Sequence, residues 1–343
     1  MKKMAPDSIL DVRDLTVKFF LDEGTVHAVN GVSFSVPAGR SVGIVGESGC
    51  GKTVSAYSIT RLLPKTARVS GEILFRERGG EITNITELEP DGGDMRRIRG
   101  KEISMIFQEP MSSLSPVHKI SNQLSEAIIQ FQGLTKRQAR ARVIELLQLV
   151  GIPQAERRVD DYPFQLSGGM RQRAMIAMAL ARNPRVLIAD EPTTALDVTL
   201  QAQVLNLIRD MQDEFKLSLI LITHDLGVVA HMVDYVSIMY LGMVVESGPV
   251  IEIFDNPKHP YTRGLMHSIP KLRGRRGERV EPIPGFVPSA YALQEGCPFC
   301  ERCPMREERC TKGIPQRVQV GSEHYVCCHV YQPGEGEPDV VNA

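Results

Sequence analysis

The chain has 343 residues, with 40 lysines and arginines against 41 aspartates and glutamates, and its formal charge of −1 argues against a general nucleic-acid-binding protein. Apolar residues make up 42% and charged residues 24%, a balance that is typical of globular proteins and excludes intrinsic disorder over most of the chain. No stretch approaches the roughly 18 uninterrupted apolar residues of a membrane span and the N-terminus lacks a signal-peptide core, so neither membrane insertion nor secretion by that route is expected.

Alternating apolar and polar residues in the first part of the chain predict β-strands, because the two faces of a half-buried strand meet different surroundings. Breaks that contain glycine or proline separate these stretches, and the first two are expected to pair antiparallel. A Gly- and Asp-rich stretch interrupts the pattern before the last of them. The predicted strands cover residues 10–20, 26–36, 41–45, 72–75 and 101–107.

The period changes to that of a helix between residues 120 and 150, where Leu124 and Ile128 fall on one face. Thr135 and Gln138 have the spacing of a capping box, in which each side chain satisfies a backbone N–H group at a helix start. Two or three helices are therefore expected to interrupt the strand-forming sequence.

The strand pattern then returns, with a helical stretch at residues 201–214 between the first two of the new strands. Alternating strands and helices predict an α/β fold with a parallel sheet. After about residue 255, prolines, basic residues and cysteines replace this pattern. We expect one domain over residues 1–255 and a small loop-rich region over residues 256–343. The new strands are expected at residues 186–189, 217–223 and 235–239.

Residues 46–53 fit the phosphate-loop pattern G-x-x-x-x-G-K-S/T, and they directly follow a predicted strand. Glycines let successive backbone N–H groups turn towards an anion, and the following helix presents its positive end. Lys52 then reaches the β- and γ-phosphates and the Thr53 hydroxyl binds Mg²⁺. Cys50 is expected to be a small side chain that alkylating reagents reach when nucleotide is absent. The predicted loop consists of Gly46, Glu47, Ser48, Gly49, Cys50, Gly51, Lys52 and Thr53.

Two adjacent carboxylates follow a buried-strand pattern further along the chain. Asp190 ends the apolar run, which places it at a strand tip where it can face Mg²⁺ through water. Glu191 comes next and is placed to polarise an attacking water molecule, so we assign it the role of general base. Gln108 and His224 each follow a predicted strand, and a histidine in that position is by itself more often structural than catalytic.

A short glycine-containing sequence makes the interpretation more specific, because it resembles the signature sequence of ATP-binding cassette (ABC) transporter ATPases. Ser167 can cap the following helix and the glycines leave the N–H groups of that helix open, so its start is an anion site without a nucleotide of its own. In that family the signature closes over the γ-phosphate held by a second ATPase subunit. The residues that resemble it are Leu166, Ser167, Gly168, Gly169 and Met170, where Met170 replaces the glutamine of many members.

Other motifs of the same family match in the expected order, and the resemblance covers residues 9–255. Phe19 resembles the aromatic residue that stacks on adenine, residues 46–53 resemble the Walker A loop, and residues 186–190 resemble the Walker B strand. The D-loop is matched by Ala195, Leu196 and Asp197, with Ala195 in place of the usual small polar residue.

This resemblance implies a fold and a set of roles. The expected fold is an α/β, P-loop ABC-type ATPase with a mixed β core, an antiparallel β subdomain, a helical subdomain at about residues 110–183 and a small Cys-rich C-terminal module. ATP and Mg²⁺ are the implied cofactors. The implied Mg²⁺ ligands are Thr53, Gln108 and Asp190, and the implied catalytic residues are Glu191, His224 and Gln108.

The tail resembles the C-terminal extension of ATPase subunits in dipeptide and oligopeptide importers. The residues that carry this resemblance are 256–265 and Cys297-Pro-Phe. Residues 107–116 also resemble the corresponding segment of the same subfamily. The implied partners are a second homologous ATPase, two transmembrane permeases and, indirectly, an extracytoplasmic peptide-binding protein, with no nucleic acid. The implied location is the cytoplasmic face of the cell membrane. A nickel importer of the same subfamily and, from another class, a soluble ABC ATPase acting on nucleic acid are the alternatives.

Six of the seven cysteines lie at or after Cys297, followed by His329. Gaps of two residues between the first three resemble ferredoxins and favour an iron–sulfur cluster, with Zn²⁺ as the competing occupant and unoccupied thiols or a disulfide as the remaining alternatives. The resemblance implies that the 4Fe–4S ligands are Cys297, Cys303, Cys310 and Cys328, which leaves Cys300 and Cys327 as extra thiols. Either a structural or a redox-sensing role is open for the cluster.

Overall fold

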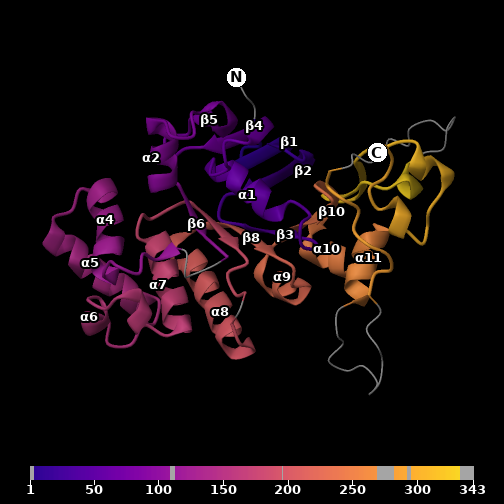
Figure 1. The fold of residues 1–343 in the computed structure, drawn as a ribbon. Coiled ribbons are helices and arrows are strands. Elements are labelled where there is room, and N and C mark those ends of the chain that lie inside the picture. Colours follow the sequence, from indigo (N-terminus) through magenta and orange to yellow (C-terminus); the bar gives the residue numbers. More distant parts are fainter. Residues whose placement is uncertain (1–3, 109–112, 195, 269–281, 292–294, 333–343) are drawn as a thin grey trace, which may run out of the picture.

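The computed structural model describes residues 4–108, 113–194, 196–268, 282–291 and 295–332. Two β-sheets form its centre, with a group of helices on one side and the C-terminal region on the other (Figure 1). No helix in the described ranges is long and apolar enough to span a bilayer.

The smaller sheet is antiparallel throughout, in the strand order β2-β1-β4-β5. Its two long N-terminal strands pair as a hairpin, which confirms the antiparallel pair expected from the sequence. The strands are β1 (Ser8–Leu21), β2 (Gly24–Pro37), β4 (Ala67–Arg76) and β5 (Ile82–Asn84).

The central sheet is mixed, in the order β11-β12-β10-β9-β3-β8-β7-β6. The neighbours from β9 to β6 are parallel, and those from β9 to β11 are antiparallel. Strands β3, β7 and β8 are buried along their whole length, which explains why they appear in the sequence as unbroken apolar runs. The strands are β3 (Ser41–Val45), β6 (Ile103–Ile106), β7 (Val186–Asp190), β8 (Ser218–Thr223), β9 (Tyr235–Tyr240), β10 (Met243–Pro249), β11 (Val318–Gly321) and β12 (His324–Val326).

Helices α4 to α6 lie to one side of the sheets and α7 contacts α4, α5 and strand β6, whereas α1, α8 and α9 lie beside the central strands (Figure 1). The capping box expected at Thr135 and Gln138 is present at the start of α5. The helices are α1 (Lys52–Thr60), α2 (Gly93–Lys101), α4 (Ile120–Gln132), α5 (Lys136–Leu149), α6 (Ala155–Arg158), α7 (Gly168–Leu180), α8 (Val198–Phe215), α9 (Leu226–Met232), α10 (Val250–Asp255) and α11 (Pro260–His267). Single 3₁₀ turns are η1 (Ile85–Glu87), η2 (Pro163–Gln165), η3 (Cys300–Arg302), η4 (Glu308–Thr311) and η5 (His329–Tyr331).

Several elements differ from the sequence prediction. The Gly- and Asp-rich stretch contains β5, η1 and α2, and α2 buries only Met95, Ile98 and Gly100, which is too few apolar residues for a visible helical period. In the tail, β12 pairs with β10 and adds to the edge of the central sheet. A strand of three residues is too short for its alternation to be recognised.

Two apolar clusters hold these layers together. One joins the helices to the central sheet, with Leu124 of α4 and Leu221 of β8 among its buried members, and Phe299 of the C-terminal region belongs to it as well. The other fills the space between the two sheets, with Leu15 from β1 and Ile188 from β7. The C-terminal region therefore packs on the same core as the rest of the chain.

Candidate functional site

The phosphate loop connects β3 to α1 and lies at the carboxyl end of the parallel strands. Gly49 and Gly51 have φ angles of 79° and 98°, in the left-handed region that favours glycine. Gly46 is required by space, because a Cβ atom there would lie 2.1 Å from the carbonyl oxygen of Met239. These constraints fix the path of the loop ahead of the N-terminus of α1.

Lys52 begins α1 and folds back across the loop. Its ammonium donates to the carbonyl oxygens of Gly46 at 2.7 Å and of Glu47 at 3.0 Å, and the residue is 5% exposed. Cys50 lies beside it and is 2% exposed, and burial raises the pKa of its thiol. The expectation that alkylating reagents reach Cys50 is therefore wrong, because the thiol is both covered and protonated.

Thr53 and Asp190 meet between α1 and the end of β7. The Thr53 hydroxyl donates to Asp190 Oδ1 at 3.1 Å, while Asp190 Oδ2 is buried and has no hydrogen-bond partner among the described residues. Burial, with the charge of Glu191 adding to it, raises the pKa of Asp190 to about 6. A hydroxyl beside an unpartnered, buried carboxylate oxygen is a donor set that fits Mg²⁺, which prefers oxygen ligands.

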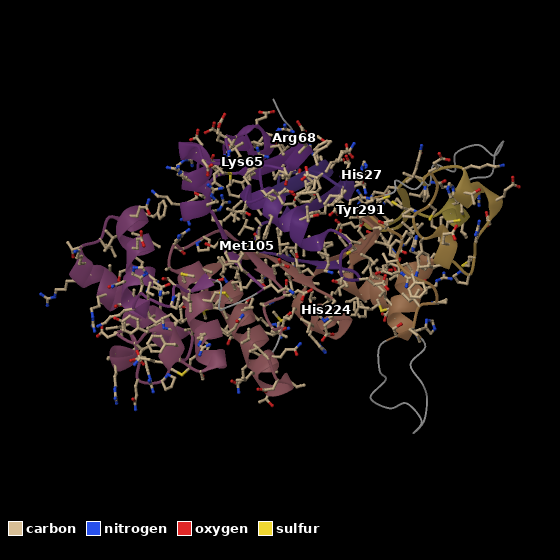
Figure 2. The ribbon with its side chains drawn as sticks, in the orientation of Figure 1. His27, Lys65, Arg68, Met105, His224 and Tyr291 are labelled. Carbon is tan, nitrogen blue, oxygen red and sulfur yellow. The ribbon has the colours of Figure 1, made fainter. Side chains whose placement is uncertain are left out.

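The carboxylate of Glu191 brings together side chains from three other positions. Oε2 accepts hydrogen bonds from Gln108 Nε2 at 3.1 Å and from the Thr194 hydroxyl at 2.9 Å. Oε1 lies 3.3 Å from Nδ1 of His224, which directly follows β8 and precedes the N-cap of α9 (Figure 2). Gln108, an expected Mg²⁺ ligand, thus contacts Glu191 in this structure and not Asp190.

Glu191 also has an unusual backbone and a shifted pKa. Its φ angle is 44°, a left-handed conformation that a residue with a side chain adopts at a cost in energy. Burial acts to raise the pKa of Glu191, but hydrogen bonds with Thr194 and His224 outweigh burial, so the pKa is lowered. Thr194 was not predicted from the sequence, where its only signal is a hydroxyl three residues after the proposed base.

The signature residues begin α7, on the side of the helical group. The Ser167 hydroxyl accepts a hydrogen bond from the N–H group of Met170 at 3.3 Å, so the expected helix cap is present. Leu166 is buried and Gly169 packs against Leu200. A Cβ atom at Gly168 would meet nothing within 4 Å, which leaves open space at the start of the helix.

The side chain of Gln172, which was not predicted from the sequence, connects this helix to the segment after β7. It is 2% exposed, and its amide donates to the carbonyl oxygen of Pro192, next to Glu191. This contact joins α7 directly to the segment that carries Glu191.

The remaining predicted site residues lie at other places. Phe19 is half-buried in β1, where its register partners are Val26 and Ala67. Asp197 caps α8 by accepting from the N–H group of Leu200 at 3.0 Å, and Leu196 precedes it. Ala195 lies outside the described residues.

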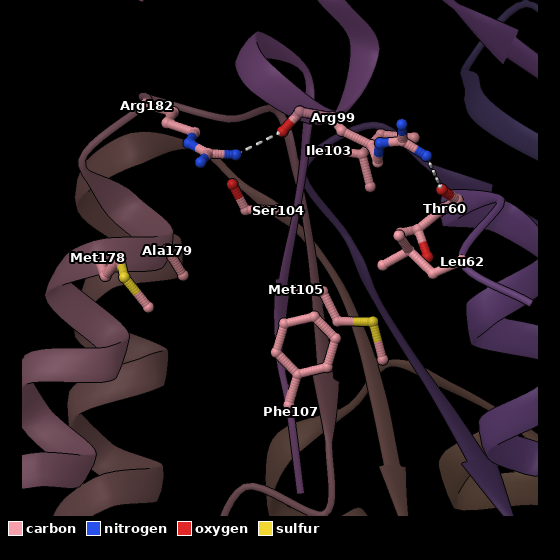
Figure 3. Close-up of a pocket in the computed structure, with 10 residues that line it drawn as sticks. All are labelled: Thr60, Leu62, Arg99, Ile103, Ser104, Met105, Phe107, Met178, Ala179 and Arg182. Atoms are coloured by element: carbon pink, nitrogen blue, oxygen red, sulfur yellow. Dashed lines mark hydrogen bonds between the residues drawn. The ribbon is translucent and has the colours of Figure 1, made fainter. Parts of the chain in front are cut away.

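A cavity of about 140 Å³ lies between β6 and α7, close to the segment that carries Gln108 (Figure 3). Two arginines cross its rim, because Arg182 donates to the carbonyl oxygen of Arg99 and Arg99 donates to that of Thr60, both at 3.1 Å. The cavity separates the helical group from the sheet at this point. Its lining consists of Thr60, Leu62, Arg99, Ile103, Ser104, Met105, Phe107, Met178, Ala179 and Arg182.

The C-terminal cysteines carry free thiols. The N–H group of Cys297 donates to the carbonyl oxygen of Cys310 at 2.8 Å, which joins two turns of the tail. Burial, with the charges of Cys310, Cys328 and Cys303 adding to it, raises the pKa of Cys297 to about 12. Burial likewise raises the pKa of Cys327 to about 11.

The thiols nevertheless do not have the arrangement of a metal site. Within the described ranges, no three histidine, cysteine, aspartate or glutamate side chains are grouped so that they could hold a metal ion. The 4Fe–4S cluster expected at Cys297, Cys303, Cys310 and Cys328, and the Zn²⁺ alternative, find no support in this geometry.

The fold and the site together define a nucleotide-binding protein of the P-loop class. Comparison with known proteins gives the family. The model of the ABC transporter family matches residues 29–194, and that of the oligopeptide/dipeptide transporter C-terminal region matches residues 245–310. This chain belongs to the ABC transporter ATPase family and carries the peptide-transporter C-terminal region.

Relatives match over nearly the whole chain. A probable peptide ABC transporter ATP-binding protein of Sinorhizobium fredii is 49% identical over 94% of this chain and 95% of its own length. In Bacillus subtilis, the dipeptide transport ATP-binding protein is 47% identical over 94% of both chains, and the oligopeptide transport ATP-binding protein is 44% identical over 98% of this chain and 93% of its own length.

Solved structures agree on the fold. A dimeric bacterial ABC transporter cassette is 26% identical with a TM-score of 0.61, over 70% of this chain and 98% of that one. The cbiO1 protein of Clostridium perfringens, described as part of an ABC transporter complex, is 29% identical with a TM-score of 0.60, over 73% of this chain and 92% of its own. The P-loop ABC ATPase fold, with its mixed and antiparallel sheets, is thereby confirmed.

Proposed function

We propose that this chain is an ATP-hydrolysing subunit of an importer that takes up dipeptides or oligopeptides through membrane permeases. The observation that carries the proposal is similarity over almost the entire length. Relatives named for peptide, dipeptide or oligopeptide transport are 44–49% identical over 94–98% of the chain. The match to residues 245–310 extends this similarity into the C-terminal region.

ATP binding follows from position and charge. The Lys52 ammonium donates hydrogen bonds to two carbonyl oxygens of the loop. When phosphate oxygens replace these two acceptors, the charge of Lys52 lies beside the β- and γ-phosphates. Loop N–H groups and the start of α1 interact with the remaining phosphate charge. Mg²⁺ bound with ATP neutralises phosphate charge, and Thr53 and Asp190 are the residues that would hold it.

Hydrolysis needs a positioned water molecule, and Glu191 is the group proposed to orient it. Hydrogen bonds from Gln108 and Thr194 hold its carboxylate, and its lowered pKa keeps it ionised at neutral pH. An ionised carboxylate of low basicity acts mainly by orienting and polarising the water rather than by removing its proton early. His224, beside Oε1, is placed to contact the γ-phosphate.

The second half of the catalytic site is proposed to come from another homologous ATPase. The start of α7, with Ser167 and Gly168, is a capped helix N-terminus that faces open space and has no nucleotide of its own. A solved relative of the same fold is described as a dimeric cassette. We therefore place this helix start over the γ-phosphate held by the partner ATPase.

Each region of the chain has a proposed part in coupling ATP hydrolysis to transport. We propose that residues 1–255 form the ATPase domain, with a helical subdomain at about 110–183 that contacts two transmembrane permeases, and that residues 256–343 form the peptide-importer extension. The complex then sits at the cytoplasmic face of the membrane, with an extracytoplasmic peptide-binding protein acting through the permeases. Support comes from the cavity and the Gln172 contact, which lie where the helical group joins the catalytic segment.

Purification of the tagged chain from membranes tests this proposal. Two permeases and a second ATPase are expected to co-purify, and ATPase activity of the complex should rise when a peptide-loaded binding protein is added. Stimulation by nickel instead of peptides would support the nickel alternative. Co-purification with nucleic acid and no permease would contradict an importer.

For the cysteines we propose only that Cys297, Cys303, Cys310 and Cys328 act as one set and that Cys300 lies outside it. The charges of Cys310, Cys328 and Cys303 all raise the pKa of Cys297, which supports the grouping. Cys300 acts on the pKa of Cys303 as well, so its place outside the set rests on the resemblance to the family. No step of the proposed ATPase mechanism uses a metal at these cysteines.

Uptake of metal by the reduced full chain tests this set. Ferrous iron with sulfide, and separately Zn²⁺, are added, and bound metal and visible absorbance are measured for wild type, Cys303→Ser and Cys300→Ser. Uptake that Cys303→Ser loses and Cys300→Ser keeps supports the set. Equal loss in both variants, or no uptake by the wild type, contradicts it.

A further inference from the structure

The C-terminal region returns to the phosphate loop through one buried arginine. Arg302 ends the turn η3, and its side chain is 4% exposed. Its Nη1 donates to Glu47 Oε2 at 2.8 Å and its Nη2 donates to Glu47 Oε1 at 3.1 Å. This is a two-point contact between a guanidinium and a carboxylate that are 255 residues apart in the sequence.

Other contacts hold the guanidinium in that orientation. Nε donates to the carbonyl oxygen of Pro284 at 3.0 Å, and Nη2 donates to that of Ile283 at 3.4 Å. The guanidinium carbon lies 5.7 Å from the ring centre of Tyr240 and 5.9 Å from that of Phe299. Hydrogen bonding with Glu47 raises the pKa of Arg302, so the side chain stays charged.

A second residue from the same part of the chain binds the backbone of Glu47. The Glu47 N–H group donates to the hydroxyl of Tyr261 at 3.0 Å. Tyr261 is fully buried, and its ring centre lies 4.7 Å from that of Tyr240 and 5.4 Å from that of Phe299. Both the side chain and the amide of Glu47 are thus fixed by residues that follow the ATPase motifs.

The segment that leads to Arg302 is itself attached to the small sheet. The N–H group of His27 in β2 donates to the carbonyl oxygen of Ala290 at 2.9 Å, and His27 and Tyr291 lie side by side in Figure 2. Tyr291 also lies over Gly24, where an added Cβ atom would be 3.5 Å from its ring. Arg302 therefore reaches the loop from a region that is held on two sides.

The charge of Glu47 makes these contacts matter for nucleotide binding. Its carbonyl oxygen is one of the two that hold the Lys52 ammonium, so this residue is part of the phosphate cradle. An unpaired carboxylate there repels the phosphates of ATP. Arg302 compensates the negative charge and turns the carboxylate towards the tail.

We propose that Arg302 is a positioning residue for ATP: it pairs with Glu47 and so keeps the phosphate loop both neutral at this position and fixed in shape. The C-terminal region then contributes to nucleotide affinity without touching the nucleotide. This inference rests on the proposed function, because it assumes that the loop binds ATP.

Binding of MgATP to the purified full chain, measured by calorimetry, tests the proposal. Arg302→Ala should raise Kd about tenfold, which corresponds to about 1.4 kcal/mol of binding free energy. This is less than the loss expected for a buried charge that itself contacts a binding partner, because Arg302 acts on ATP only through Glu47. The increase should be larger for ATP than for AMP, because the repulsion grows with phosphate charge. Arg302→Lys keeps the charge and should lose less affinity.

The double variant Arg302→Ala with Glu47→Gln separates positioning from a merely structural role. Removing the carboxylate removes the repulsion, so the double variant should regain most of the lost affinity, whereas a general loosening of the tail would not be repaired. Arg306→Ala is the matched control, because Arg306 belongs to the same region and is half-exposed beside Glu301. It should bind as the wild type does.

Two results would overturn the inference: wild-type affinity in Arg302→Ala, or no recovery in the double variant. Neither result affects the proposed function, which fails separately if the wild-type chain does not bind MgATP or if its complex does not respond to peptides.

Discussion

Glu191 is held by side chains that come from different parts of the chain. Gln108 follows β6, and His224 follows β8. Thr194 lies three residues after Glu191 itself. The left-handed backbone at Glu191 keeps the carboxylate at this meeting point. Strain of this kind persists where the surroundings fix a conformation, and it is common at active sites.

Glu191→Gln tests the role of this carboxylate at the level of a single residue. Glutamine keeps the shape and accepts hydrogen bonds through one oxygen, but it does not polarise water as a carboxylate does. We expect MgATP affinity within about threefold of wild type and a loss of hydrolysis on the order of 100-fold or more at this site. ATP binding and phosphate release by the purified complex measure the two effects.

Glu214→Gln, on the exposed face of α8, serves as the control for Glu191→Gln and should hydrolyse ATP normally. Undiminished phosphate release by Glu191→Gln would refute the assignment of the base.

At the scale of elements, the sequence predicts best those that have a long, single-period pattern. The parallel strands are unbroken apolar runs because both faces are buried. Helix α8 begins three residues before the predicted 201–214 and ends one residue after it. Prediction from the sequence pattern fails for α2 and for β12, because these short elements are stabilised by contacts with distant residues.

The same distinction applies to the site. The phosphate loop, Asp190 and Glu191 are local patterns that can be recognised from neighbours in the sequence. Gln172, Arg302 and Tyr261 are not, because each acts on a residue far away in the chain and its own neighbours carry no motif. Contacts of this kind depend on how the elements pack, which sequence spacing does not reveal.

The helix α11 has an unusual start that makes its stability depend on pH. His259 is its N-cap, and Nδ1 accepts a hydrogen bond from the N–H group of Tyr261 at 3.1 Å. Burial, with the charge of Arg263 adding to it, lowers the pKa of His259 to about 3. A protonated ring would lose the acceptor and place a positive charge at the positive end of the helix.

His259→Asn tests the consequence. Above the unfolded pKa of 6.5 the histidine is neutral in both states and contributes no pH dependence. Below it the unfolded chain takes up a proton that the folded chain refuses, so the free energy of unfolding falls, by about 2 kcal/mol at about pH 5. Asparagine caps the helix without titrating. Between about pH 7.5 and 5, the free energy of unfolding measured in urea should therefore fall by about 2 kcal/mol less in the variant than in the wild type.

His267→Asn, an exposed histidine in the same helix, should keep the wild-type pH dependence. Equal acid sensitivity in His259→Asn and wild type would show that His259 is not the group responsible.

For the whole molecule, Glu246 is the point where the tail is fastened to the core. It lies in β10 and is 1% exposed, and its carboxylate accepts hydrogen bonds from the N–H groups of Lys258 at 2.6 Å and His259 at 2.9 Å. Nε2 of His324, in β12, lies 2.8 Å from Oε1. One carboxylate thus joins the central sheet, the segment before α11 and the tail strand.

His324→Ala should therefore loosen the tail as a unit. Glu246 keeps its two backbone donors but loses its buried side-chain partner, which costs about 3 kcal/mol of unfolding free energy. Because Arg302 belongs to the same tail, MgATP affinity should fall as well, and the first proteolytic cuts should move into residues 282–332. Urea unfolding, calorimetry and limited proteolysis measure these effects, with the exposed His231→Ala as control. An unchanged unfolding midpoint with an unchanged cleavage pattern would contradict this prediction. It would mean that the strand pairing of β12 and the Arg302 contact hold the tail without the contact between Glu246 and His324.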